Sequence, residues 1–145
     1  MYNVYSIAVP SPIVSVTNGS TLYTGSISLF NCTATINNSN IDVDIDPVFT
    51  WSMNGVPIDY KTTRFSKSDT MNDNTGVYHS QLQIAPLLKQ DESVLECTVY
   101  MYPKPINGFI QPSDNVMGST MIRVKGISII AVLNCMITLF YHSRF

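Results

Sequence analysis

Short segments in which apolar and polar residues alternate make up most of the chain, and turn-forming residues separate them. Because successive side chains of a β-strand point to opposite faces, this alternation predicts strands that each bury one face. No segment has the spacing of an amphipathic helix. About seven short strands with turns between them indicate an all-β sandwich or barrel. The strands are expected over residues 12–17, 26–36, 48–53, 77–84, 93–101 and 116–124, with one or two short edge strands within residues 61–76.

The same alternation predicts the core, because every second residue of an expected strand lies on one face. Asn54-Gly55 follows one of these strands and is a strong hairpin signal, since both residues tolerate positive φ. Residues 102–115 contain three prolines and Asn107-Gly108 and are expected to form a loop. The expected core residues are Phe30, Phe49, Trp51, Leu82, Ile84 and Leu95.

Composition argues against several classes of function. Charged residues make up 12% of the chain, against about 25% in an ordinary soluble domain, and the net charge is -2. Nucleic-acid binding needs clustered Lys and Arg, so nucleic acid is not an expected partner. Neither His79 nor His142 lies in a metal-ligand spacing or beside a plausible nucleophile. We therefore expect no enzymatic activity and no cofactor.

Asp42, Asp44 and Asp46 alternate along the chain and raise the question of a calcium site. An EF-hand loop has Gly at its sixth position and Glu at its twelfth, but this chain has Pro47 and Met53 there. Solvated acids in a loop between two strands are therefore expected, and no metal site is predicted. A weak calcium site shared with another domain is the alternative.

The three cysteines fall into two groups. Cys32 and Cys97 lie in alternating segments typical of strands, whereas Cys135 lies within a continuous apolar run. This partition indicates one pair and one unpaired thiol that packs among apolar residues. Three unrelated buried thiols are the alternative.

Cys32, Trp51 and Cys97 follow one another at separations of 19 and 46 positions, each within an expected strand. Residues 10–125 resemble the immunoglobulin superfamily. The resemblance implies a Greek-key sandwich of about 7–9 strands, with a Cys32–Cys97 disulfide between the sheets and Trp51 beside it. Such a disulfide persists in an oxidising compartment. The segments that carry the resemblance are Phe30-Asn31-Cys32, similar to strand B, Phe49-Thr50-Trp51, similar to strand C, Leu82-Gln83-Ile84, similar to strand E, and residues 91–97, similar to the Asp-x-Gly-x-Tyr-x-Cys motif before strand F.

The chain departs from that motif at two positions. Ser93 stands where the family has Gly, and Leu95 stands where it has Tyr. Without a phenolic hydroxyl at Leu95, the hydrogen bond of the tyrosine corner cannot form. Residues 54–76 leave the subtype open, because they could hold the C′ and D strands of an intermediate or variable type.

Three N-x-Ser/Thr sequons begin at Asn18, Asn31 and Asn37. Asn18 and Asn37 fall in expected loops, and Asn31 should face outward because the neighbouring Cys32 faces inward. All three placements allow N-glycosylation, which favours the secretory pathway.

Residues 127–141 form an apolar run that only Ser128, Asn134 and Thr138 interrupt. At 1.5 Å per residue the run spans about 22 Å, less than the roughly 30 Å of a bilayer core, and extension back to Ile122 gives about 20 residues. Residues 126–145 are therefore expected to form a short transmembrane anchor. A removable lipid-anchor signal and a buried strand at a premature chain end are the alternatives.

The first twelve residues lack the basic and apolar regions of a secretory signal. Since the sequons and the cysteine pair indicate secretion, we expect an N-terminal part to be missing. Residues 1–9 are then a linker or the remnant of a preceding domain, with its last strand over 4–9. The domain itself is expected over residues 10–125.

These features predict an extracellular recognition or adhesion module that the C-terminal run attaches to the plasma membrane; a secreted protein is the alternative. Sandwiches of this kind commonly bind a protein partner through end loops. Lys104, Phe109 and Ile110 are the expected partner-binding residues, although Phe109 and Ile110 could instead pack onto the domain. A spacer domain with no ligand of its own is the alternative function. Homophilic and heterophilic binding both stay open.

Overall fold

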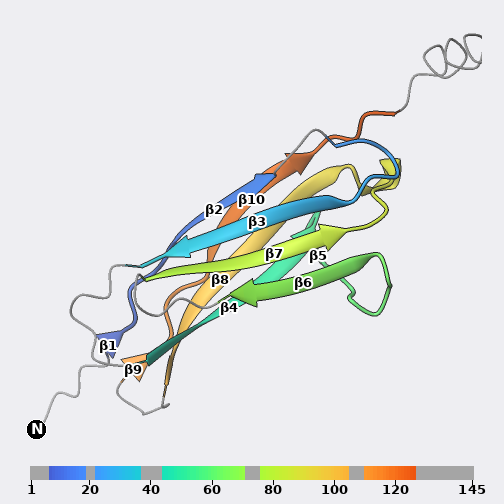
Figure 1. Cartoon of the computed structure of the whole chain (residues 1–145). Helices are drawn as coiled ribbons and strands as arrows, with labels where there is room; N and C mark the ends of the chain where they lie inside the picture. Colours follow the sequence, from blue (N-terminus) through green and yellow to red (C-terminus); the bar gives the residue numbers. More distant parts are fainter. Residues whose placement is uncertain (1–6, 19–21, 37–43, 71–75, 105–109, 127–145) are drawn as a thin grey trace, which may run out of the picture.

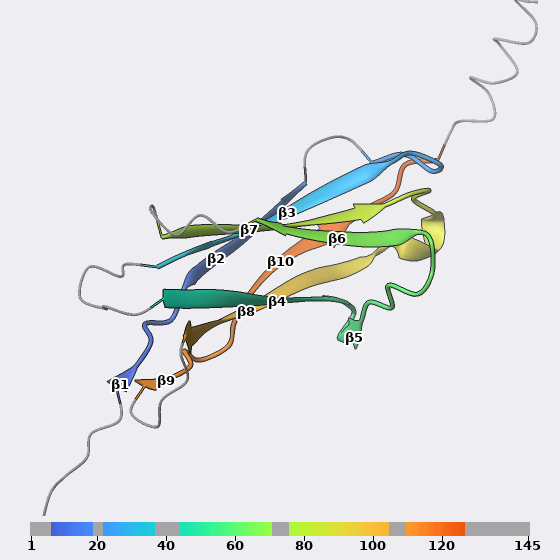
Figure 2. The same cartoon turned by 60° about the horizontal axis from the view of Figure 1, so that its bottom comes forward.

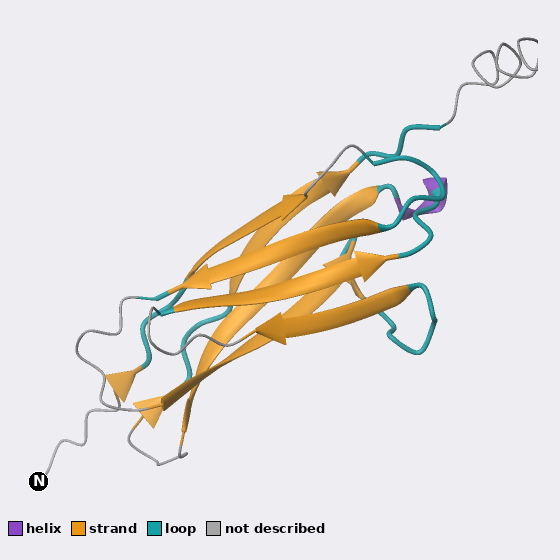
Figure 3. Cartoon of the chain, viewed as in Figure 1, coloured by secondary structure: helices purple, strands orange, loops and turns teal. Residues whose placement is uncertain are grey.

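The computed structural model describes residues 7–18, 22–36, 44–70, 76–104 and 110–126. Two four-stranded antiparallel sheets lie one over the other (Figure 1), and a view turned by 60° shows the two layers (Figure 2). The helical structure of the described residues is a single short 3-10 turn, η1 (Lys89–Asp91), near one end of the sandwich (Figure 3). The expected all-β sandwich is confirmed.

Each sheet combines strands that are distant in sequence. The first sheet contains, in order, β2 (Ile13–Asn18), β3 (Ser28–Thr35), β7 (Val77–Ile84) and β6 (Phe65–Thr70). The second sheet contains, in order, β10 (Val116–Ile122), β8 (Ser93–Lys104), β4 (Asp44–Met53) and β5 (Val56–Pro57). A separate two-stranded pairing joins β1 (Ile7–Ala8) to β9 (Ile110–Gln111) in parallel.

The core lies between the facing sides of the two sheets. Every second residue of β3 and β7 is buried, as the alternation predicts. Burying one large apolar side chain stabilises the fold by roughly 1.5–3 kcal/mol. All six residues expected in the core are buried: Phe30, Phe49, Trp51, Leu82, Ile84 and Leu95.

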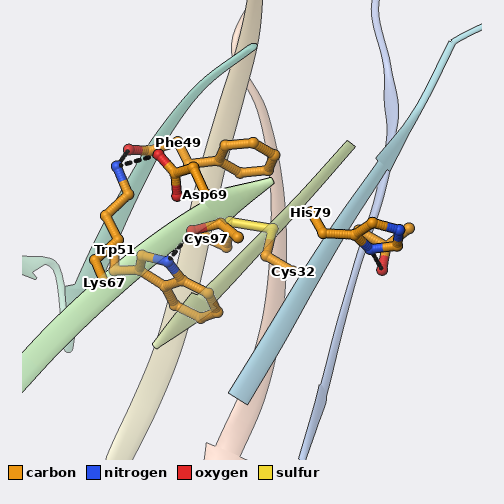
Figure 4. Close-up of a disulfide and its surroundings, with 9 residues drawn as sticks. Cys32, Phe49, Trp51, Lys67, Asp69, His79 and Cys97 are labelled. Carbon is orange, nitrogen blue, oxygen red and sulfur yellow. Dashed lines mark hydrogen bonds and ion pairs between the residues drawn. A yellow bond between two sulfur atoms is a disulfide. The ribbon is translucent and has the colours of Figure 1, made fainter. Parts of the chain in front are cut away.

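Two contacts join the sheets through the middle of this core (Figure 4). A disulfide links Cys32 of β3 to Cys97 of β8, with their Cα atoms 6.4 Å apart. The indole Nε1 of Trp51 donates a hydrogen bond to Ser80 Oγ on β7, at 2.9 Å. Since both polar groups are buried, this hydrogen bond removes the cost of leaving either one unsatisfied.

Two strands are longer than expected, because prolines within them are tolerated. β4 begins at Asp44 rather than at residue 48, and β8 continues to Lys104, so part of the segment expected as a loop is strand. In β4, the carbonyls of Phe49 and Trp51 point away from β8. Since backbone groups alternate in direction along a strand, those of Pro47 point the same way as those of Phe49. The position of its missing N–H therefore lies at the open edge of β4, where no strand would accept a hydrogen bond.

Pro103 is tolerated in β8 for a similar reason. The Met101 N–H donates to Ser113 Oγ, so the backbone groups of Met101 and, by alternation, Pro103 point away from β4. On that side β10 pairs with β8 only as far as Val99. The missing N–H of Pro103 therefore removes no bond to a neighbouring strand.

The N-terminal segment also differs from the expectation. Residues 4–9 were expected to end a preceding domain, but Ile7 and Ala8 pair with Ile110 and Gln111 of the same chain. Val9, which follows directly, is buried in the core. Residues 7–9 are therefore packed on this sandwich.

The turn after β4 forms as the Asn-Gly signal predicts. Asn54 and Gly55 have φ values of 49° and 79°. The Asn54 side chain accepts a hydrogen bond from the Val94 N–H, and the Asn54 N–H donates to the Val94 carbonyl, both at 2.9 Å. These two bonds hold the turn against β8.

At the opposite edge, β2 of the first sheet approaches β10 of the second closely. A Cβ atom on Gly118 would lie 3.1 Å from Val14 Cγ1 and 3.2 Å from Val16 Cγ2. Glycine at this position therefore lets the two edge strands approach. Beyond β10 the chain is held too, because the Lys125 N–H donates to the Leu22 carbonyl and the Thr24 N–H donates to the Lys125 carbonyl.

Candidate functional site

The outer faces of the two sheets are the broadest described surfaces, and they differ in chemistry. On the first sheet, the residues that alternate with the core are mostly uncharged and polar. We call this surface the polar face. No charged side chain occurs among its described residues, which are Ile13, Ser15, Thr17, Leu29, Asn31, Thr33, Thr35, Ser66, Ser68, Thr70, Val77, His79, Gln81 and Gln83.

Side-chain hydrogen bonds cross the polar face between β3 and β7. Gln81 Nε2 donates to Asn31 Oδ1 at 3.2 Å, and Thr33 Oγ1 lies 3.3 Å from His79 Nδ1. Asn31 and Thr33 are the first and third residues of one sequon. Its middle residue, Cys32, points into the core and carries the disulfide.

The second sheet turns tyrosine, methionine and valine side chains outward. We call this surface the aromatic face. Tyr100 and Tyr102 lie side by side on β8 with ring centroids 6.4 Å apart, edge to face. Glu96 accepts a hydrogen bond from Ser52 Oγ at 3.3 Å. The face consists of Asp46, Val48, Thr50, Ser52, Val94, Glu96, Thr98, Tyr100, Tyr102, Met117, Ser119 and Met121.

Met117 and Met121 make this face unusual for a sheet in contact with water. Their side chains are 57% and 53% exposed. Ser119, which lies between them on the same side of β10, is the kind of small polar residue that a solvent-exposed strand position usually carries. Methionine and tyrosine are enriched in protein interfaces. The aromatic face can therefore bury apolar surface against a partner.

A shallow pocket of about 440 Å³ lies at one end of the aromatic face. Beside it, a hydrogen bond from Lys89 and a second from the Val124 N–H hold the pKa of Glu92 below its usual range. The pocket combines an apolar wall with one acid and one base and can accept a single side chain of a partner. It is lined by Asn54, Glu92, Ser93, Val94, Met121, Ile122 and Arg123.

Much of the end loop expected to bind a partner lies outside the described residues. Lys104 ends β8 and Ile110 begins β9. Phe109 and the side chains of Lys104 and Ile110 are outside the described part of the chain. Their role stays a prediction. The last described residue before this loop, Lys104, ends the strand that carries Tyr100 and Tyr102.

The sequons belong to the first sheet where the structure describes them. Asn18 is the last residue of β2 and is exposed, and Asn31 is a half-buried residue in the middle of β3. Asn37 lies outside the described residues. The expectation that Asn18 lies in a loop is wrong, because it still pairs with Phe30.

The alternating acids also lie elsewhere than expected. Asp44 and Asp46 belong to β4, where they pair with Lys104 and Tyr102, rather than to a loop between strands. Asp42 lies outside the described residues. Within the described ranges, no three His, Cys, Asp or Glu residues form a group that could hold a metal ion.

Two contacts of basic side chains were not predicted from the sequence. Arg64, just before β6, forms an ion pair with Asp91, which is 4% exposed and also accepts the Leu88 N–H at 2.7 Å. Lys67 of β6 donates to the carbonyl of Phe49 at the edge of β4, at 2.6 Å. Figure 4 shows Lys67 reaching from one sheet to the other. No sequence spacing marks either pair.

The membrane segment expected over residues 127–141 lies outside the described residues. Its expected extension back to Ile122 is wrong, because Ile122 is the last residue of β10 and is buried in the core. Among the residues that are described, none belongs to a helix long and apolar enough to cross a membrane. Cys135 and His142 are outside them as well.

Comparison with known proteins places the fold. No protein-family model matches the chain, and no curated protein sequence does either. The chain is similar to a solved structure of titin immunoglobulin domains, Titin-A168169, with a TM-score of 0.53 and 16% sequence identity. The match covers 80% of this chain and 49% of the titin chain, so this chain spans about half its length. At this identity the likeness shows the fold: the chain is an immunoglobulin-like β-sandwich.

Proposed function

We propose that the chain is an immunoglobulin-superfamily recognition module, outside the cell, which binds a protein partner and catalyses no reaction. One observation carries the proposal, namely the contrast between the polar face and the aromatic face. Half-buried Tyr100 and Tyr102 and exposed Met117 and Met121 supply contact area on the aromatic face, whereas the polar face exposes Ile13 and Leu29 but carries no tyrosine or methionine. Buried tyrosines at the centre of an interface commonly contribute 2 kcal/mol or more of binding energy (roughly, from alanine scanning).

The proposed partner contact extends from the aromatic face to the last loop. β8 carries Tyr100 and Tyr102 outward and ends at Lys104, the first of the three loop residues assigned to binding. Phe109 and Ile110 would add an apolar anchor at that end. A partner that covers the face removes water from the Glu96 carboxylate. The hydrogen bond from Ser52 Oγ compensates for part of that lost hydration.

Location and attachment belong to the same proposal. A disulfide within an immunoglobulin-like fold is compatible with an extracellular or secreted domain. The sequons support passage through the secretory pathway, and the apolar run over residues 127–141 supports a C-terminal membrane anchor. Mass spectrometry of the native protein before and after reduction and glycosidase treatment tests location. Free thiols and unmodified asparagines would reject the extracellular assignment.

A spacer without a ligand is the second candidate. The hydrogen bonds between Lys125 and the Leu22–Thr24 segment favour it, because they hold the chain rigidly where it leaves the domain. A rigid exit is useful in a domain that sets the distance between other modules. The spacer predicts no affinity of the domain for any partner.

A binding screen separates the two candidates. The full chain, displayed on cells, is exposed to a panel of extracellular proteins, and each binder is measured against two double variants. Tyr100→Ser/Tyr102→Ser should weaken binding at least tenfold, which corresponds to about 1.4 kcal/mol. Ser66→Ala/Gln83→Ala on the polar face is the control and should bind as the wild type does. The absence of any binder, or equal loss in both variants, rejects the aromatic face as the site.

A further inference from the structure

The sequon at Asn31 occupies a place in the fold that restricts when it can be modified. Asn31 lies in the middle of β3, opposite Thr17 of β2 on one side and Gln81 of β7 on the other. Cys32, its middle residue, is fully buried and bonded to Cys97. The sequon is thus paired along both backbone edges and fixed at its centre.

The folded domain can nevertheless hold a glycan there. Asn31 points to the polar face, and its Oδ1 accepts the hydrogen bond from Gln81 Nε2. Glycosylation uses the other atom, Nδ2, which donates no hydrogen bond to another described residue. The side chain can therefore carry a sugar and keep its bond to Gln81. The folded structure is therefore compatible with a glycan on Asn31.

The transfer reaction needs a different state of the chain. Asn31 Nδ2 forms a bond to C1 of the sugar of a lipid-linked oligosaccharide, and the bond from C1 to the diphosphate oxygen breaks. The lipid diphosphate leaves with the electron pair, and the amide gives up one proton to a base on the transferase. A transferase must enclose both Asn31 and the Thr33 hydroxyl, which here lies against His79.

Opening the folded sheet for that enzyme is costly. Freeing β3 breaks its pairing with both β2 and β7, which amounts to unfolding the sandwich. Domains of this size resist unfolding by roughly 5–15 kcal/mol, so the open state is populated far less than one part in a thousand. Folded chains therefore offer the transferase almost no substrate at Asn31.

We propose that Asn31 is an N-glycosylation site that is modified only before β3 is enclosed and Cys32 bonds to Cys97, so that disulfide closure ends its modification. The glycan then covers the polar face and leaves the aromatic face to the partner. This inference rests on the proposed extracellular function, because only the secretory pathway supplies the transferase and the lipid-linked oligosaccharide.

Chain order sets the length of the window. Cys97 is 65 residues after Cys32. At roughly 5–20 residues per second, synthesis of that stretch takes about 3–13 s, during which Asn31 has no disulfide to close over it. Asn18 provides an internal comparison, because it is exposed at the end of β2 and contains no cysteine in its sequon. Partial modification is expected at Asn31, with occupancy at Asn18 independent of the disulfide.

The test measures glycan occupancy at both sites in the full chain, directed into the secretory pathway of a eukaryotic cell by an added signal sequence. Glycosidase treatment in heavy-oxygen water marks each modified asparagine for mass spectrometry of total cellular protein. Cys97→Ser leaves the Asn31-Cys32-Thr33 sequon intact and prevents closure. Occupancy at Asn31 should rise at least twofold in this variant, while that at Asn18 stays constant.

A second measurement removes the dependence on a variant that folds poorly. Wild-type chains synthesised during a short pulse of membrane-permeable reductant should show the same rise at Asn31. Full occupancy at Asn31 in untreated wild type, or no rise under either condition, overturns the inference, as does a parallel rise at Asn18. If one of these outcomes is found while Asn18 is glycosylated and Cys32 is disulfide-bonded, the inference fails but the proposed function stands. Bare asparagines with free thiols at every site reject the proposed function itself.

Discussion

The two sheets turn similar faces to each other and different faces to solvent. Both inner faces consist of buried apolar residues, such as Leu82 on β7 and Leu95 on β8. Outward, β3 and β7 carry Thr33 and Gln81, whereas β8 carries Tyr100. Close packing fixes the inner residues, because a gap or a clash in the core costs several kcal/mol (about 2–5 for a large-to-small change). Solvent imposes no such requirement, so the outer faces are free to differ.

The two faces keep their different positions only while the sandwich is folded. Removing its stabilising contacts one at a time measures how much each contributes to the fold. The largest effect is expected from Cys97→Ser, which removes the disulfide between β3 and β8. For a loop closed over 65 residues the unfolding free energy should fall by about 4 kcal/mol. Urea denaturation measures the loss, and reduced wild type should match the variant. A loss below about 1 kcal/mol would contradict a structural role for the bond.

Arg64→Met should have the next largest effect. It leaves Asp91, which is 4% exposed, without its cation and with the Leu88 N–H as its remaining bond among those described. Losing one partner of a buried pair costs about 3 kcal/mol, because the remaining charge is uncompensated. Thermal and urea unfolding should both show the loss. Arg123→Met, at an exposed arginine, is the control and should change stability by about 0.5 kcal/mol or less.

Lys67→Met should lower the unfolding free energy less, but it should leave the open edge of β4 in the second sheet unprotected. The change removes the hydrogen bond to the Phe49 carbonyl and the ion pair with Asp69, at a cost of about 1–2 kcal/mol. It also leaves an edge strand unprotected, so weak self-association is expected in sedimentation at high concentration. Lys61→Met makes the same charge change at an exposed position and should stay monomeric. Equal behaviour of the two variants would show that Lys67 does not protect the edge.

The smallest effect concerns Glu92, at the pocket end of the aromatic face. The hydrogen bond from Lys89, and then that from the Val124 N–H, lower the pKa of Glu92 in the folded state. A depressed folded-state pKa contributes stability above the unfolded-state value, about 4.3, and this contribution is lost as the pH falls through the folded-state pKa. Wild type should therefore lose slightly more stability than Glu92→Gln on acidification through this range. Parallel pH profiles of the two proteins would contradict the assignment.

The core and the sandwich could be predicted because they follow from local alternation. Trp51 and Cys97 each lie in a strand whose every second residue is apolar, and burial enforces that pattern. Strand ends were harder, since Pro47 and Pro103 suggest breaks in the sequence. Only the pairing register shows that their missing N–H groups fall where no neighbouring strand would accept them.

The candidate site was largely beyond prediction. Which face is aromatic can be read from β8 alone, as Tyr100 and Tyr102 alternate with Val99 and Met101, but its extent needs the neighbours β4 and β10. The contacts of Arg64 with Asp91 and of Lys67 with Phe49 join residues 27 and 18 positions apart. Such contacts arise from the tertiary arrangement, and no local spacing encodes them.

The hydrogen bonds that hold Lys125 against Leu22 and Thr24 also have a geometric consequence. Whatever follows residue 126 therefore starts from a fixed point on the domain rather than from a free strand end.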